Sequence, residues 1–120
     1  MKDWLNVDAC IEWLNDEASS MDKPFMLYLG IESPHPSFLT SEEYLDAICD
    51  DGVEIPPKDE SNHPYLTYLR KTLIQRYDFS EETVKTIRKV YFAMISEVDR
   101  MVGKVLNCME DLGLDESTYI

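Results

Sequence analysis

The chain has 120 residues, of which 44% are apolar and 11% aromatic, enough for the hydrophobic core of one domain. Its 24 acidic residues outnumber its 11 basic residues, which gives a formal net charge of −13. This balance argues against nucleic acid and membrane surfaces as partners, because both need a basic footprint. The charge balance indicates a solvated acidic surface. The sequence also shows no cluster of cations that could bind an anionic substrate.

The cysteines and the start of the chain give no sign of a compartment. Cys10, Cys49 and Cys108 show neither metal-ligand spacing nor a disulfide framework. Cys10 and Cys108 fall at apolar positions of helical patterns, which predicts buried free thiols. We find no signal peptide, no apolar stretch long enough to span a membrane and no Asn-x-Ser/Thr acceptor, so the chain itself carries no secretion signal.

The first predicted element is a helix over residues 6–19. Asn6 is the expected N-cap and Asp8 lies in the first turn. Four apolar residues then recur with helical spacing: Val7, Cys10, Ile11 and Leu14.

Residues 24–31 follow as an unbroken apolar run, which predicts a core strand buried on both faces, as in a parallel sheet. The run leads to His35, which lies between Pro34 and Pro36. Because Pro34 and Pro36 favour an extended backbone in the residues before them, His35 is expected at the carboxyl end of the strand. Open α/β sheets bind their ligands at that end.

Residues 33–79 are expected to form an ordered, loop-rich insertion with short helices. A helix over residues 41–48 has Thr40 or Ser41 as its cap, and a second short helix follows His63-Pro64. The sequence Asp50-Asp51-Gly52 predicts a turn. Four aromatic residues are expected to anchor the insertion: Tyr65, Tyr68, Tyr77 and Phe79.

The longest predicted element is a helix over residues 80–112, with Ser80 as N-cap and Gly113 at the C′ position. Its methionine-rich apolar stripe suits packing against a sheet better than a binding groove. Residues 118–120 have strand propensity and are expected to begin the next parallel strand. A buried strand that stops after three residues suggests a fragment of a larger domain.

Three short segments, in this order and at this spacing, carry a family resemblance. They are residues 24–30 (PFMLYLG) with 34–36 (PHP), residues 91–99 (YFAMISEVD) with 102–106 (VGKVL), and residues 112–120 (LGLDESTYI). Together they resemble the sulfatase family of the alkaline phosphatase superfamily. Residues 1–120 are then expected to be an internal part of an α/β, alkaline-phosphatase-like sandwich. One subgroup of the family is similar in its loop residues: Asp3-Trp4, Asn6, Asp8, Glu12-Trp13-Leu14, Ile55-Pro56 and His63-Pro64.

The resemblance implies a sulfuric ester hydrolase that acts on sulfate esters, such as those of sulfated sugars or glycosaminoglycans. Sulfatases use a formylglycine, made from the cysteine or serine of a C-x-P-x-R motif, and a calcium ion. Physically, cations stabilise the charge of the transferring group while a proton donor assists the leaving oxygen. The complete protein is expected to be lysosomal or secreted.

A residue-by-residue comparison leaves one site residue in this chain. None of the three cysteines begins a C-x-P-x-R motif, and the calcium ligands of the family are expected outside these residues. Asp50-Asp51 lies in a turn and not at a strand end, so we assign it no metal. His35 matches the family histidine that contacts the sulfate or the leaving oxygen, a position from which an imidazole can act as general acid. His63 has the same His-Pro form, and both a surface position and the substrate rim stay open for it.

Without the remainder of the catalytic domain, the chain is expected to be inactive. Two alternatives stay open from the sequence. One is a related phosphodiesterase or phosphomutase of the same superfamily. The other is an acidic interaction module that binds a partner through the methionine-rich helix.

Overall fold

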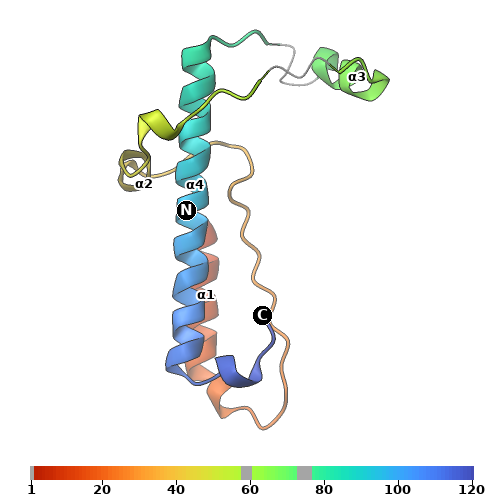
Figure 1. Cartoon of the computed structure of the whole chain (residues 1–120). Coiled ribbons are helices and arrows are strands. Elements are labelled where there is room, and N and C mark those ends of the chain that lie inside the picture. The colour runs from red at the N-terminus through yellow and green to blue at the C-terminus, as the bar shows by residue number, and fades with distance from the viewer. Residues whose placement is uncertain (1, 58–60, 73–76) are drawn as a thin grey trace.

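The computed structural model describes residues 2–57, 61–72 and 77–120, which are mostly helical and contain no strand in these ranges (Figure 1). The elements follow in the order α1 (Lys2–Asp16), η1 (Ala18–Ser20), α2 (Glu42–Asp46), η2 (Asp50–Gly52), α3 (Pro64–Thr72), α4 (Glu81–Asp111) and η4 (Asp115–Ser117). The α/β sandwich expected from the sequence therefore stays a prediction.

The long helix α4 begins and ends as the sequence predicts. The Ser80 hydroxyl accepts a hydrogen bond from the Thr83 N–H at 3.2 Å, and Glu81 and Glu82 lie in the first turn, where they favour the helix dipole. At the other end, Gly113 has a φ of 66°. Leu114 N–H donates to Met109 O, and Gly113 N–H donates to Glu110 O, each at 2.9 Å. This pair of bonds is a Schellman motif, which satisfies the last carbonyl groups of the helix.

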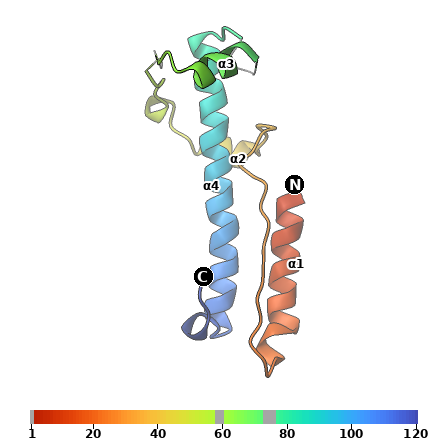
Figure 2. The same cartoon turned by 90° about the vertical axis from the view of Figure 1, so that its right-hand side faces the viewer.

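The core forms where α1 packs along the second half of α4 with the same chain direction (Figure 2). The buried side chains of α1 recur every three or four residues and include Val7, Cys10 and Leu14. Cys10 and Leu14 form one cluster with the buried Met109 of α4, and Met101 is also buried. The methionine-rich stripe of α4 is therefore a packing surface, as predicted, although in the described residues its partner is a helix and not a sheet.

The start of α1 corrects one prediction. The helix begins at Lys2, so Asn6 lies inside it and is not an N-cap. The Asn6 side-chain amide instead donates to the Gly30 carbonyl at 3.1 Å, which fixes the extended segment that follows against the helix. A polar residue near the start of a helix can bind a neighbouring segment as readily as its own backbone, and the sequence alone does not separate the two.

Residues 24–31 run extended beside α1, but they pair with no strand among the described residues (Figure 1). Phe25 and Leu29 pack against the helical core, and the Phe25 ring lies edge-on to Trp13 at 5.2 Å between centroids. Met26 and Tyr28, on the opposite face, are 94% and 89% exposed. The predicted burial on both faces is therefore wrong for this structure, because nothing in the described chain covers the outer face.

Residues 118–120 are also extended and unpaired, and the C-terminus lies next to the start of the 24–31 segment (Figure 1). Residues of both segments and of α4 line an open groove of about 430 Å³. Residues 118–120, the predicted second strand, thus lie near residues 24–31 without the backbone ladder that defines a strand pair.

The 33–79 region is only partly tied to the helices, and its residues 58–60 and 73–76 lie outside the described ranges. Helix α2 packs on α4, whereas no residue of α3 is buried. All four aromatic residues that were expected to anchor this insertion are exposed: Tyr65, Tyr68, Tyr77 and Phe79. That prediction is wrong, since the described residues offer these rings no core to enter; Tyr77 and Phe79 pack on each other.

The two faces of residues 24–31 should respond differently to charge. We expect the double change Met26→Lys and Tyr28→Lys to leave the helical circular dichroism unchanged and to reduce aggregation, because it places charges on an exposed apolar edge. Leu29→Lys, the matched control on the inner face, should lower the melting temperature because it buries a charge in the core. Equal losses of melting temperature in both variants would contradict the assigned faces.

Candidate functional site

The turn that carries His35 is attached to the first turn of α1 by one carboxylate. Asp3 is only 5% exposed, and its two oxygens accept three hydrogen bonds from the turn. The Glu32 N–H donates to Oδ1 at 3.1 Å, and the Ser33 N–H and hydroxyl donate to Oδ2 at 3.0 and 2.7 Å. The His35 N–H in turn donates to the Glu32 carbonyl at 3.0 Å. Two hydrogen bonds in series, from His35 to Glu32 and from Glu32 to Asp3, therefore connect the backbone of His35 to the helix.

The charge state of Asp3 suits this role. Burial raises the pKa of the carboxyl, but the hydrogen bonds from Ser33 and Glu32, together with the positive charge of Lys2, outweigh it. The net effect holds the pKa of Asp3 below its ordinary value of 3.8. The carboxylate thus stays ionised, as an acceptor of three donors must.

His35 lines a small, open pocket of about 290 Å³ at this turn, together with Lys2, Asp3, Glu32, Ser33 and Met94 among others. The imidazole is exposed, and its Nδ1 lies 2.9 Å from the Pro36 carbonyl oxygen. A carbonyl only accepts hydrogen bonds, so Nδ1 carries the proton, and Nε2 is the nitrogen left for a ligand. The neutral ring then offers an acceptor at Nε2, and the protonated ring offers a donor.

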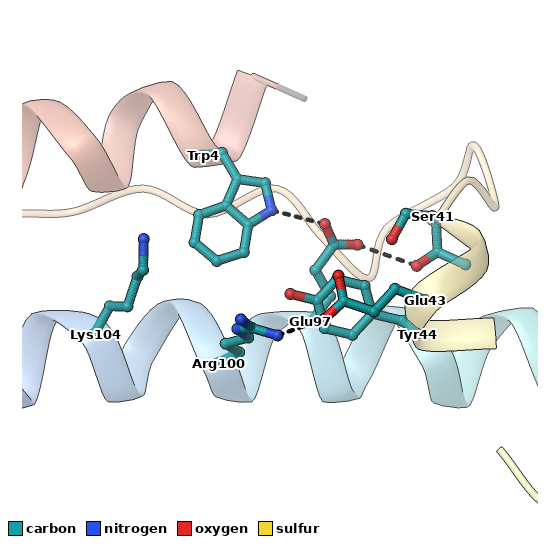
Figure 3. A pocket seen from close by; sticks show the side chains of 8 residues that line it. Trp4, Ser41, Glu43, Tyr44, Glu97, Arg100 and Lys104 are labelled. Atoms are coloured by element: carbon teal, nitrogen blue, oxygen red, sulfur yellow. Dashed lines mark hydrogen bonds and ion pairs between the residues drawn. The ribbon is translucent and has the colours of Figure 1, made fainter. Parts of the chain in front are cut away.

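A second carboxylate, which the sequence analysis did not single out, joins three segments. Glu97 of α4 is 2% exposed; Trp4 Nε1 donates to its Oε1 at 2.8 Å, and the Thr40 hydroxyl donates to its Oε2 at 3.1 Å (Figure 3). The residue lies on the buried stripe between Met94 and Met101, and a carboxylate at such an apolar position was the available signal. Thr40 therefore holds α4 and does not cap α2, where Ser41 makes no capping bond either.

A cavity of about 580 Å³ lies beside Glu97, and each charged group that lines it contacts a neighbouring side chain (Figure 3). Arg100 pairs with Glu43 at 2.7 Å and lies 5.9 Å from the Tyr44 ring. Lys104 lies 5.1 Å from the centre of the Trp4 ring. These contacts attach α1 and α2 to α4. The polar side chains that line the cavity therefore have a structural role.

The structure does not bring the remaining sequence candidates to His35. His63 is exposed, lies just before α3 and accepts the Tyr65 N–H at Nδ1, 3.3 Å away, and it does not line the His35 pocket. Its place at a substrate rim stays a prediction. Asp50 of η2 pairs with Lys89 at 2.7 Å. Across the described ranges, no three His, Cys, Asp or Glu side chains are grouped as metal ligands.

All three cysteines are free thiols, and the predicted burial is confirmed for Cys10 but only in part for Cys108. Cys10 is buried, Cys108 is half-buried and Cys49 is exposed. Burial raises the pKa of the Cys10 thiol, and the nearby Cys108 adds to the effect, so Cys10 is not activated as a nucleophile. No helix in the part of the chain that the structure describes is both long and apolar enough to cross a membrane.

Comparison with known proteins identifies the class to which this turn and helix pair belong. The family model described as "Sulfatase" matches residues 1–120, and the chain belongs to the sulfatase family. Its relatives are named arylsulfatase K: it is 35% identical to the protein of Bos taurus, 32% to that of Homo sapiens and 31% to that of Danio rerio. These matches cover 98–100% of the chain but only 25–26% of each relative, so the chain spans about a quarter of their length. No solved structure matches.

The Asp3 contacts predict a pH-dependent contribution to stability. Because folding lowers the pKa of Asp3, its stabilisation is fully present above the unfolded value near 3.8 and is lost as the pH falls through the lower folded value. We expect Asp3→Asn to lower the free energy of unfolding by about 1–3 kcal/mol at neutral pH. In urea unfolding followed by circular dichroism, this difference should shrink below pH 4.

The matched control is Asp8→Asn, since Asp8 is an exposed aspartate of the same helix. It should change the free energy of unfolding by less than about 0.5 kcal/mol at every pH. An Asp3→Asn effect as large at acid pH as at neutral pH would show that the ionised carboxylate is not what stabilises the turn.

Proposed function

We propose that this chain is part of a sulfuric ester hydrolase of the arylsulfatase type, in which His35 contacts the sulfate ester. The observation that carries the proposal is the His35 turn: it matches the family motif in sequence, and hydrogen bonds to the buried Asp3 hold it at a pocket. The similarity to proteins named arylsulfatase K supports the same activity. It also favours a sulfatase over the related phosphodiesterases and over an acidic interaction module.

The chain's own contribution to such a reaction is limited to binding and proton transfer at His35. With Nδ1–H bonded to the Pro36 carbonyl, the neutral ring has a defined tautomer, and Nε2 is the nitrogen left to bind a ligand. A protonated His35 would donate from Nε2 to a sulfate oxygen or to the leaving oxygen, which lowers the cost of bond cleavage. Lys2 adds a positive charge to the lining of the same pocket.

The groups that would complete the chemistry do not fit the residues of this chain. A formylglycine needs the C-x-P-x-R motif, which none of the three cysteines begins. A calcium ion needs several oxygen ligands, and the described residues group no three acidic or histidine side chains. We propose that both come from the remainder of the catalytic domain, and we derive no step through them.

The substrate and location remain part of the same proposal. We propose sulfate esters of sugars, including glycosaminoglycans, as the substrate class. We also propose a lysosomal or secreted location for the complete protein. The support is family membership and the arylsulfatase name of the relatives, together with a formal net charge of −13, which disfavours nucleic acid and membrane surfaces as partners.

The test is sulfatase activity of the full-length polypeptide that carries these residues. We expect His35→Ala to lower kcat/KM about 10²–10⁴-fold, the usual range for loss of a general acid or base. The loss should be larger for a sugar sulfate than for p-nitrophenyl sulfate, whose leaving oxygen needs little protonation.

His63→Ala is the matched control, because His63 has the same His-Pro context and lies outside the His35 pocket. Its kcat should equal that of the parent protein. A parent protein without sulfatase activity, or a His35→Ala variant with full activity on both substrates, would refute the proposed function.

A further inference from the structure

We propose that Asp3 is a positioning residue for His35: by binding the 32–33 backbone, it fixes the place and orientation of the imidazole. The inference rests on the proposed function of His35. The family resemblance includes the Asp3-Trp4 segment but gives Asp3 no role at the site.

The contacts make Asp3 the attachment point of the turn. Both carboxylate oxygens are used, and all three of their donors come from Glu32 and Ser33. The next hydrogen bond toward the site runs from His35 N–H to Glu32 O. A displaced Glu32 therefore moves the backbone from which the imidazole projects.

Few other contacts can replace this attachment. Among the described residues, the remaining hydrogen bond between α1 and this part of the chain is that of Asn6 to Gly30, five residues before His35. On the other side of the turn, the Phe38 ring meets Tyr91 edge-on at 6.5 Å, and the Thr40 hydroxyl, five residues after His35, donates to Glu97 at 3.1 Å. The bond from His35 Nδ1 to Pro36 O lies within the turn and moves with it.

The helix that carries Asp3 is itself held in place. Trp4, the next residue, donates to the buried Glu97 of α4 at 2.8 Å, so the first turn of α1 is tied to the longest helix. A positioning residue needs such support, because a misplacement of about 1 Å at a catalytic group can cost two orders of magnitude in rate.

The test compares Asp3→Asn, Ser33→Ala and Asp8→Asn in the full-length polypeptide. Asn keeps the size of Asp but replaces one acceptor oxygen by a donor, so it cannot accept all three bonds. We expect Asp3→Asn to lower kcat about 10–100-fold with little change in KM, as for other residues that orient a catalytic group. Ser33→Ala removes one bond of three and should lose less than tenfold, and Asp8→Asn should lose nothing.

A second arm distinguishes positioning from stability. In the His35→Ala background, Asp3→Asn should cause no further loss of activity, because the group that it orients is gone. An equal loss in both backgrounds would overturn the proposal. So would a wild-type kcat in Asp3→Asn.

A third arm is independent of sulfatase activity. In nitrogen-15 NMR spectra of the 120-residue chain, His35 should show the proton on Nδ1, and Asp3→Asn or Ser33→Ala should shift the ring toward a mixture of tautomers. Unchanged His35 signals in both variants would overturn the role of Asp3. A full-length protein without activity, with shifted His35 signals in these variants, would refute the proposed function and leave the positioning contact standing.

Discussion

The burial of the Asp3 carboxylate is the constraint on which the arrangement of the site depends. Burial of an ionised carboxylate costs several kcal/mol unless hydrogen bonds from the protein replace those it made to water. Asp3 receives three such bonds, and all of them come from the turn that precedes His35. The extended segment must therefore end at the first turn of α1. This end of the segment determines where the imidazole of His35 lies.

The helix pair explains how a chain that spans about a quarter of its relatives' length can present this turn. Helices α1 and α4 bury their apolar stripes against each other, and Phe25 and Leu29 close one side of the same core. The other face of the 24–31 segment carries exposed apolar side chains and unpaired backbone, the features of a strand that lacks its neighbours. A chain with a net charge of −13 also lacks the cations that a sulfate needs, so we propose that the remaining domain supplies both.

The sequence predicts what depends on local periodicity and capping. The bounds of α4 follow from Ser80, the spaced apolar residues and Gly113, and the structure has each of them. His35 is predicted at the end of an apolar run, and the structure places it at a pocket there. The relatives that match are named arylsulfatase K, the subgroup that the loop residues resemble.

What the sequence does not predict depends on contacts between distant residues. Asp3 and Glu97 act on partners 29 to 93 positions away, and no local pattern marks which polar residues will be buried. The sequence predicts that Asn6 caps a helix, but an asparagine side chain can equally bind a neighbouring segment, as Asn6 does here. The sequence predicts that the aromatic residues of the insertion anchor it, yet the described part of the chain gives them no core.

The most direct test of the Asp3 contact is amide hydrogen exchange at Glu32 and Ser33. The N–H groups of both residues are bonded to a buried carboxylate, whereas the Met26 N–H, in the same extended stretch, has no partner among the described residues. We expect Glu32 and Ser33 to exchange at least tenfold more slowly than Met26, and to lose that protection in Asp3→Asn. Exchange at Glu32 and Ser33 as fast as at Met26 in the unaltered chain would contradict the claim that Asp3 holds the turn.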